Sequence, residues 1–208
     1  MIDQTAVLEA IAREISEGTG CDDPPVDALR LAALVGFEVC SGRGRREGTT
    51  LFVPFGRYPE IMVHWLCAHE LAHGILALEP AVENTEENAS YLAAALLLPR
   101  RSFCADLQRT GWSLSRLHAI YWTAPPLAIA RRIAECRDAI ASVWTSGARL
   151  RRRFAQKHVL TPRTLPLEAA LAAGCWTDGV LEHDNGSAQV VVGPRGGRTA
   201  IVVVDAET

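Results

Sequence analysis

The stretch from residue 66 to residue 99 restricts the fold of this chain more than any other. Two segments with helical spacing of apolar residues lie on either side of Glu79-Pro80, and Pro99 follows the second. Proline is tolerated at the start of a helix but not inside one, because it lacks an N–H group and clashes with the preceding turn. The pattern predicts a helix over 65–78, a turn at Pro80 and a second helix that ends at Leu98.

The first of these helices carries the sequence His69-Glu70-Leu71-Ala72-His73. Residues i and i+4 share one helix face, so His69 and His73 can direct ring nitrogens to one point. Zinc takes nitrogen ligands at about 2.0–2.1 Å in tetrahedral geometry. Glu70 is angled toward a water on the metal rather than toward the metal itself, which is typical of a general base in metal-assisted hydrolysis. The spacing predicts a zinc site with His69 and His73 as ligands and Glu70 as the catalytic base.

A catalytic zinc site needs a third protein ligand and keeps a fourth position open for water. The turn at Pro80 brings the following segment back toward the histidines, and that segment supplies four candidates, Glu79, Glu83, Glu86 and Glu87. Glu79 lies at the turn, whereas a carboxylate on the second helix is aimed by a rigid backbone. The competing interpretations are two packed histidines at helical spacing and acids that are favoured at a helix start by the helix dipole.

The segments "AHELAH" and "EENASYLAAALLLP" resemble the ImmA/IrrE family of metallopeptidases. That family has AHELGH followed by a helix reading roughly E-x-x-A-[ND]-x-F-A-A-x-L-L-M-P. With the two sequences aligned on the final proline, the family's ligand glutamate falls on Glu86. Ala72 replaces the usual Gly, Leu92 replaces Phe, and Ser90 replaces an Asn or Asp that would orient a ligand. The resemblance covers roughly residues 26–137.

This resemblance implies an α+β fold with a zincin-like metallopeptidase core, in which helices pack on a small sheet. It implies one Zn²⁺ per chain held by His69, His73 and Glu86, with Glu70 as the catalytic residue. The implied function is a zinc-dependent endopeptidase that cleaves a helix-turn-helix transcriptional repressor in a phage or stress response. The alternatives are a transcriptional regulator or DNA- or protein-binding module with zinc in a structural or vestigial role, and a toxin or effector companion active on a neighbouring gene's product.

The charge of the chain is divided unevenly along its length. Residues 100–163 hold thirteen Lys and Arg and three acids, a net charge of +10, and the other residues hold eight basic and twenty-one acidic side chains, a net charge of −13. Helices expected over 101–109, 113–121 and 125–144 resemble the helix-turn-helix-like unit that often follows in this family. The basic segment fits phosphate contacts with DNA, docking on the acidic remainder, or a solvated face, and DNA binding is not the favoured interpretation.

The remaining segments predict short strands and a C-terminal module. Residues 37–41 and 49–53 read as a β-hairpin, and 163–174 as a short helix. Turn signals between β-branched runs then predict a three-stranded meander over 180–205. We expect three parts: a metallopeptidase domain over 1–99, a basic helical segment over 100–163 and a β-rich module over 164–208.

Other features limit the location and the choice of ligands. The N-terminus lacks a basic region followed by an apolar core, and the longest apolar run, residues 92–99, is too short to span a membrane. We therefore expect a cytoplasmic protein with no membrane partner. Six cysteines without a C-x-x-C pair are expected as reduced, buried thiols. The histidines outside the motif lack comparable partners and are expected at the surface or packed: His64, His118, His158 and His183.

Overall fold

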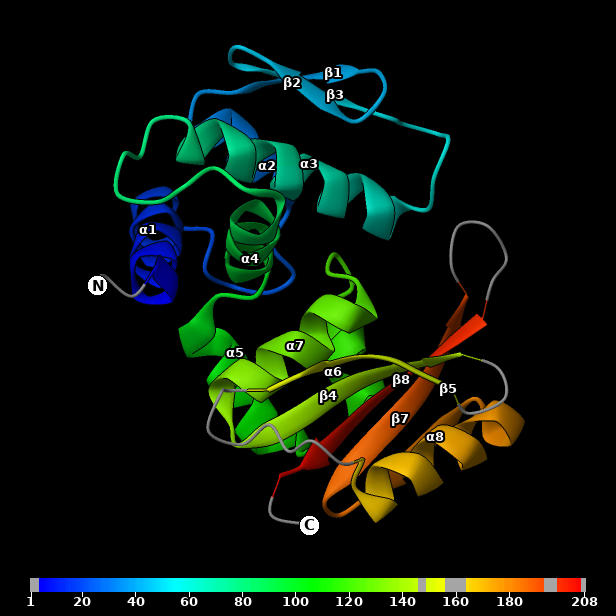
Figure 1. Ribbon diagram of the computed structural model, residues 1–208. Coiled ribbons are helices and arrows are strands. Elements are labelled where there is room, and N and C mark those ends of the chain that lie inside the picture. Colours follow the sequence, from blue (N-terminus) through cyan, green and yellow to red (C-terminus); the bar gives the residue numbers. More distant parts are fainter. Residues whose placement is uncertain (1–3, 146–148, 156–163, 193–197, 207–208) are drawn as a thin grey trace. The chain divides into compact units, whose positions relative to one another are not determined.

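The computed structural model describes residues 4–145, 149–155, 164–192 and 198–206. Within these residues the chain forms eight helices and two sheets, which confirms the predicted α+β class (Figure 1). The helices are α1 (Gln4–Thr19), α2 (Ala28–Leu34), α3 (Glu60–Leu76), α4 (Glu86–Leu97), α5 (Arg100–Thr110), α6 (Leu114–Ile120), α7 (Pro126–Cys136) and α8 (Pro166–Asp178). The strands are β1 (Glu38–Ser41), β2 (Arg45–Glu47), β3 (Thr50–Val53), β4 (Ala139–Thr145), β5 (Arg149–Phe154), β6 (Val180–His183), β7 (Gly186–Val192) and β8 (Arg198–Asp205).

The chain divides into two compact units. The first comprises Met1–Phe103 and Ile120–Pro125, and the second comprises Cys104–Ala119 and Pro126–Thr208. The charge asymmetry follows this division, because the first unit has eight basic and fifteen acidic residues and the second has thirteen basic and nine acidic ones. The grouping differs from the expected three parts, because β4 and β5 pair into the same sheet as the strands that follow residue 164.

In the first unit, α3 packs against β2 and β3 on one side and against α4 on the other. Helix α2 also packs on α3, and α1 lies beside α4 (Figure 1). Asp27 caps the start of α2, since its Oδ1 accepts hydrogen bonds from the N–H groups of Leu29 and Arg30. Fully buried leucines from strand and helices form the core around α3: Leu31, Leu51, Leu71, Leu92 and Leu96.

The predicted hairpin between residues 37–41 and 49–53 is wrong. Strands β1 and β3 pair in parallel, and β2, which lies in the expected loop, pairs antiparallel with β3. The tight turn lies at Gly48, whose φ of 58° is readily adopted by glycine. Because this turn joins β2 to β3, β1 is left to pair with the opposite edge of β3, giving the sheet order β1-β3-β2.

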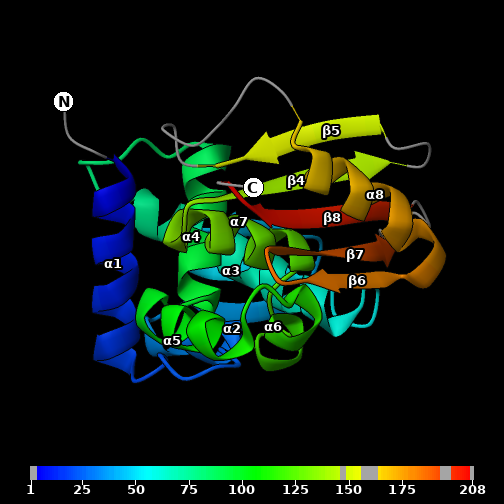
Figure 2. The same cartoon turned by 90° about the horizontal axis from the view of Figure 1, so that it is seen from below.

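The second unit contains an antiparallel sheet of order β5-β4-β8-β7-β6. The predicted meander is confirmed as β6, β7 and β8, and β4 and β5 extend it; the glycine-rich breaker at 193–197 lies outside the described residues. Helix α8 covers one face, where Ile140, Val202 and Val204 form the core, and α7 packs on the other (Figure 1, Figure 2). Strand β8 is buried on both faces, so its run of β-branched residues is continuous rather than alternating.

The predicted helix from residue 125 to 144 is also wrong in its second half. Helix α7 ends at Cys136, and Ala139–Thr145 forms the strand β4. The segment "AIASVWT" contains β-branched and aromatic residues that fit a pleated surface, and pairing with β8 overrides the helical spacing of its alanines. By contrast, the predicted N-cap at Ser113 is confirmed, because its hydroxyl accepts a hydrogen bond from the N–H of Arg116.

The basic stretch after β4 forms the edge strand β5. Arg149, Arg151 and Arg152 are exposed, whereas Arg153 pairs with the buried Glu168 of α8 at 2.9 and 3.0 Å. The last residue of the strand, Phe154, lies under the guanidinium of Arg131 from α7. The positive charge of β5 is therefore concentrated in three exposed arginines on one edge of the sheet.

A polar contact joins the start of α6 to β6 in the second unit. The hydroxyls of Ser113 and Ser115 donate hydrogen bonds to the carboxylate of Glu182, and these bonds hold its pKa below the usual value. Among the residues that the structure describes, no helix is both long enough and apolar enough to cross a bilayer.

Candidate metal centre

Helix α3 positions both motif histidines on one face. Ala68, Leu71 and Ala72 are fully buried, whereas His69 and His73 are half-buried on the side facing α4. The ring of Trp65 lies nearly parallel to that of His69, with a centroid separation of 6.3 Å. Behind the motif, a Cβ on Gly74 would lie 2.5 Å from the ring of Phe37, so glycine allows this ring to pack directly against the helix.

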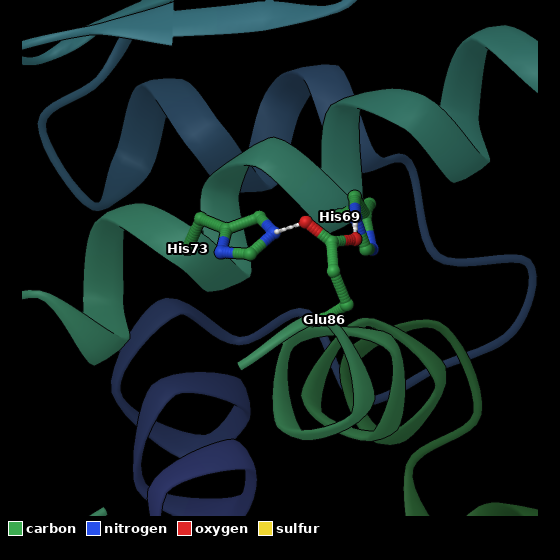
Figure 3. Close-up of side chains that lie close together, drawn as sticks. All are labelled: His69, His73 and Glu86. Atoms are coloured by element: carbon green, nitrogen blue, oxygen red, sulfur yellow. Dashed lines mark hydrogen bonds and ion pairs between the residues drawn. The ribbon is translucent and has the colours of Figure 1, made fainter. Parts of the chain in front are cut away.

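Helix α4 begins at Glu86, the residue that the aligned pattern predicts as the third ligand. Thr85 caps the helix, because its hydroxyl accepts a hydrogen bond from the N–H of Asn88 at 3.2 Å. Glu86 therefore lies in the first turn, where its negative charge is favoured by the helix dipole. Figure 3 shows its carboxylate reaching from α4 to a position between the two imidazoles on α3.

The three side chains form a cluster that could hold a metal ion. Nε2 of His69 lies 3.2 Å from Oε2 of Glu86, and Nε2 of His73 lies 3.3 Å from Oε1 of Glu86. One ligand atom from each residue lies within 4.8 Å of the others. Ligands placed tetrahedrally about 2.05 Å from zinc are themselves separated by about 3.3 Å. The two nitrogen–oxygen distances, each to a different oxygen of Glu86, are close to that separation, and the donor types suit zinc.

The other glutamates considered from the sequence do not join this cluster. Among the described residues, the cluster contains His69, His73 and Glu86. Glu79 is used in the turn that follows α3, where its Oε1 accepts a hydrogen bond from the N–H of Ala81 at 3.0 Å. Glu83 and Glu87 are exposed on either side of Glu86. The structure thus distinguishes Glu86 from the alternatives that spacing alone left open.

Asn84 is a polar neighbour of the site that the sequence did not reveal. Its Oδ1 lies 2.7 Å from Nδ1 of His73, and its Nδ2 donates a hydrogen bond to the backbone oxygen of His73 at 3.1 Å. Ser90, which the family pattern placed in a supporting position, makes no hydrogen bond to the cluster among the described residues. In the sequence, Asn84 is visible only as an amide side chain two residues before Glu86, and no spacing rule predicts a role for that position.

The hydrogen-bond partners of His73 limit what can lie between its ring and Glu86. A neutral His73 that donates from Nδ1 to Asn84 presents the lone pair of Nε2 toward the carboxylate of Glu86. Two acceptors that face each other at 3.3 Å repel unless a proton or a cation lies between them. Two imidazole nitrogens and a carboxylate oxygen are a donor set that suits zinc.

Glu70 lies next to His69 on the same helix and is half-buried. Among the described residues it forms no hydrogen bond or ion pair, so its carboxylate is not occupied by a structural role. The nearby Cys67 is fully buried and donates from Sγ to the backbone oxygen of Ala28. Burial, followed by the charges of Asp27 and Glu70, raises the pKa of Cys67 to about 12. Among the described residues, Cys67 does not join the cluster of His69, His73 and Glu86, so it is not one of the candidate ligands.

Among the described residues, the histidines outside the motif do not join the cluster. His64 is buried, its Nδ1 accepts a hydrogen bond from the N–H of Ala28, and its ring meets that of Trp122 edge to face, as expected for a packed histidine. His118 is half-buried, and burial lowers its pKa. His183 is exposed, and His158 lies outside the described residues.

The chain shares its fold with a solved protein whose function is named only in general terms. The sequence matches no protein-family model, and a search of curated proteins gave no match. Among solved structures, a Mycobacterium tuberculosis transcriptional regulator is similar, with a TM-score of 0.67 and 14% sequence identity over 95% of this chain and 75% of that chain. At this identity the likeness concerns the fold alone.

We predict that Glu86→Gln weakens zinc binding by more than about tenfold, because the amide removes the negative ligand while keeping the size of the side chain. Glu83→Gln and Glu87→Gln change charge at neighbouring exposed positions and should bind zinc as the wild type does. Competition with a chromophoric chelator measures the three dissociation constants. An equal loss in Glu87→Gln and Glu86→Gln would show that charge near the helix start, rather than ligation, determines the affinity.

Proposed function

We propose that this protein is a zinc-dependent endopeptidase of the ImmA/IrrE type that cleaves a helix-turn-helix transcriptional repressor. The observation that carries the proposal is the placement of Glu86 between His69 and His73, with Glu70 unengaged on the same helix. Two histidines and a glutamate are the protein ligands of catalytic zinc in several peptidases, whereas structural sites close with four protein ligands. Among the described residues, no fourth metal-ligating side chain joins this cluster.

The proposed reaction is the hydrolysis of a peptide bond. When bound, zinc would polarise the scissile carbonyl and lower the pKa of water. His69 and His73 supply neutral donors, and Glu86 supplies one negative charge that partly balances the cation. Glu70 holds the attacking water through its carboxylate, accepts the proton as the water attacks, and passes that proton to the leaving nitrogen.

The identity of the proposed substrate rests on the resemblance in residues 26–137 and not on the cluster. A repressor is a folded protein, so cleavage requires an exposed segment that can approach the metal centre. The substrate is therefore to be sought among helix-turn-helix proteins encoded beside this gene.

We predict that Glu70→Gln abolishes repressor cleavage while leaving zinc bound, because the amide cannot accept a proton. Loss of one general base typically slows a reaction by about 10²–10⁴-fold. Purified wild type and variant, each loaded with one equivalent of zinc, are incubated with the neighbouring repressor, and fragments are followed by mass spectrometry. Glu87→Gln is the matched control and should retain activity. Cleavage by Glu70→Gln at the wild-type rate would exclude the proposed mechanism.

A second candidate function is transcriptional regulation through DNA, with zinc in a structural role. Two observations favour it: the fold is shared with a protein named as a transcriptional regulator, and β5 exposes Arg149, Arg151 and Arg152 on a sheet edge. Arginines of this kind contact phosphates without reading sequence. Their charges also protect an edge strand from pairing with other chains, so they do not by themselves require a nucleic acid.

Under this second candidate, the wild type should bind duplex DNA at low salt with an affinity that falls steeply as salt rises. Replacing Arg149, Arg151 and Arg152 with Gln should reduce the slope of log K against log salt by up to about 0.9 for each phosphate that the variant no longer neutralises. Fluorescence anisotropy at several salt concentrations, starting from about 50 mM, measures both slopes. No binding by the wild type at the lowest salt concentration, or an unchanged slope in the triple variant, would exclude a DNA-binding role for β5.

A further inference from the structure

Asn84 makes two contacts with the same histidine, one to its ring and one to its backbone. We infer that Asn84 is a positioning residue that fixes the tautomer of His73 and links its orientation to the placement of Glu86. The expected effect of Asn84 on zinc binding rests on the proposed function. The tautomer of His73, by contrast, is a property of the protein without metal.

The backbone contact fixes the orientation of the Asn84 amide. The oxygen of His73 can only accept a hydrogen bond, so the atom of Asn84 that lies 3.1 Å from it must be the NH₂ group. The carbonyl Oδ1 of Asn84 therefore faces Nδ1 of His73 at 2.7 Å. An amide oxygen cannot donate, so the proton of this hydrogen bond must belong to Nδ1.

The tautomer of His73 follows from this chain of contacts. With the proton on Nδ1, the neutral imidazole has its lone pair on Nε2, and this atom is 3.3 Å from Glu86. Metal-binding histidines commonly donate their other ring N–H to an oxygen acceptor, which fixes the ring and raises its basicity. Asn84 supplies such an acceptor, although the aligned family pattern places no residue in that role at this position.

The same side chain also stabilises the end of α3. The oxygen of His73 accepts from the N–H of Ala77 at 3.1 Å as well as from Asn84, so both of its lone pairs are used in the last turn of the helix. A change at Asn84 therefore acts on the ring and on the backbone of His73 together.

Contacts on the other side of Asn84 connect it to Glu86. Asn84 lies between Glu83 and the helix cap Thr85, and Asn88 Nδ2 donates to the backbone oxygen of Glu83 at 2.7 Å. The same amide of Asn88 lies 3.2 Å from Oε1 of Gln4 in α1. The segment that carries Asn84 is thus held to the first turn of α4, and Glu86 begins that turn two residues later.

The rings of His69 and His73 are held in place by different contacts. Nδ1 of His69 is buried and has no hydrogen-bond partner among the described residues, and its ring is oriented by the packing of Trp65. The described residues therefore constrain the ring of His73 by hydrogen bonding and that of His69 by stacking. Removal of the Asn84 amide should consequently affect His73 and leave His69 unchanged.

Two variants and one control test the inference on the full chain. Asn84→Ala removes both hydrogen bonds, and Asn84→Asp keeps an acceptor for Nδ1 but lacks the donor to the backbone. The control, Ser90→Ala, changes a half-buried polar residue of α4 that makes no hydrogen bond to the cluster among the described residues. The first readout is a ¹H–¹⁵N spectrum of the histidine side chains in metal-free protein at about pH 8, above the usual histidine pKa of about 6.5. The second is the zinc dissociation constant.

The wild type and Ser90→Ala should show His73 as the single Nδ1–H tautomer. Asn84→Ala should show a mixture, with zinc binding about 10–100-fold weaker, and Asn84→Asp should restore the Nδ1–H tautomer and at least part of the affinity. Circular dichroism confirms that each variant is folded. An Nε2–H tautomer in the wild type, or an unchanged tautomer in folded Asn84→Ala, would overturn the inference.

The outcome for the proposed function is separate from the outcome for Asn84. If the wild type binds no zinc, the metal centre is excluded, while the tautomer measurement still decides the role of Asn84 in the metal-free protein. If the wild type binds zinc and Asn84→Ala has the same tautomer and the same dissociation constant, the role of Asn84 is excluded and the metal centre stands.

Discussion

The carboxylate of Glu86 lying between two imidazoles is the contact on which the rest of the site depends. It joins α3 to α4 through groups that repel each other when the facing nitrogens carry no proton, so the contact requires a proton or a cation. The surrounding contacts hold the three groups in place. Thr85 and Asn88 fix the start of α4, Gly74 lets Phe37 support the back of α3, and α1 lies beside α4. The site is accessible from solvent through the exposed Glu86.

The helical part of the site could be predicted from sequence because helices impose local rules. The i, i+4 spacing placed His69 and His73 on one face, and Pro80 marked the turn before α4. Spacing could not choose among the glutamates that follow, since all lie close to the turn, and the choice of Glu86 came from the aligned family pattern. Asn84 could not be predicted, because its role depends on the path of the turn between α3 and α4 and on a backbone oxygen, neither of which follows from residue spacing.

The strands could likewise be predicted only where local residue patterns determine them. The meander over 180–205 was predictable because turn residues separate runs of β-branched residues. The segment 139–145 is wrongly predicted as helix because its alanines favour helix locally, whereas the pairing with β8 that makes it a strand comes from residues about 60 positions later. The arginines of β5 were recognisable as a basic segment, but the edge position that separates Arg153 from its exposed neighbours is a property of the sheet.

The proposed metal centre is tested most directly by identifying the atoms that bind zinc. X-ray absorption at the zinc edge, measured on the full chain loaded with one equivalent of zinc, reports the ligand types and their distances. We expect two imidazole rings and oxygen donors at about 2.0–2.2 Å, with no sulfur, because no cysteine of the described residues joins the cluster of His69, His73 and Glu86. A thiolate sulfur at about 2.3 Å, or zinc that remains in solution, would contradict the assignment of His69, His73 and Glu86 as a metal centre.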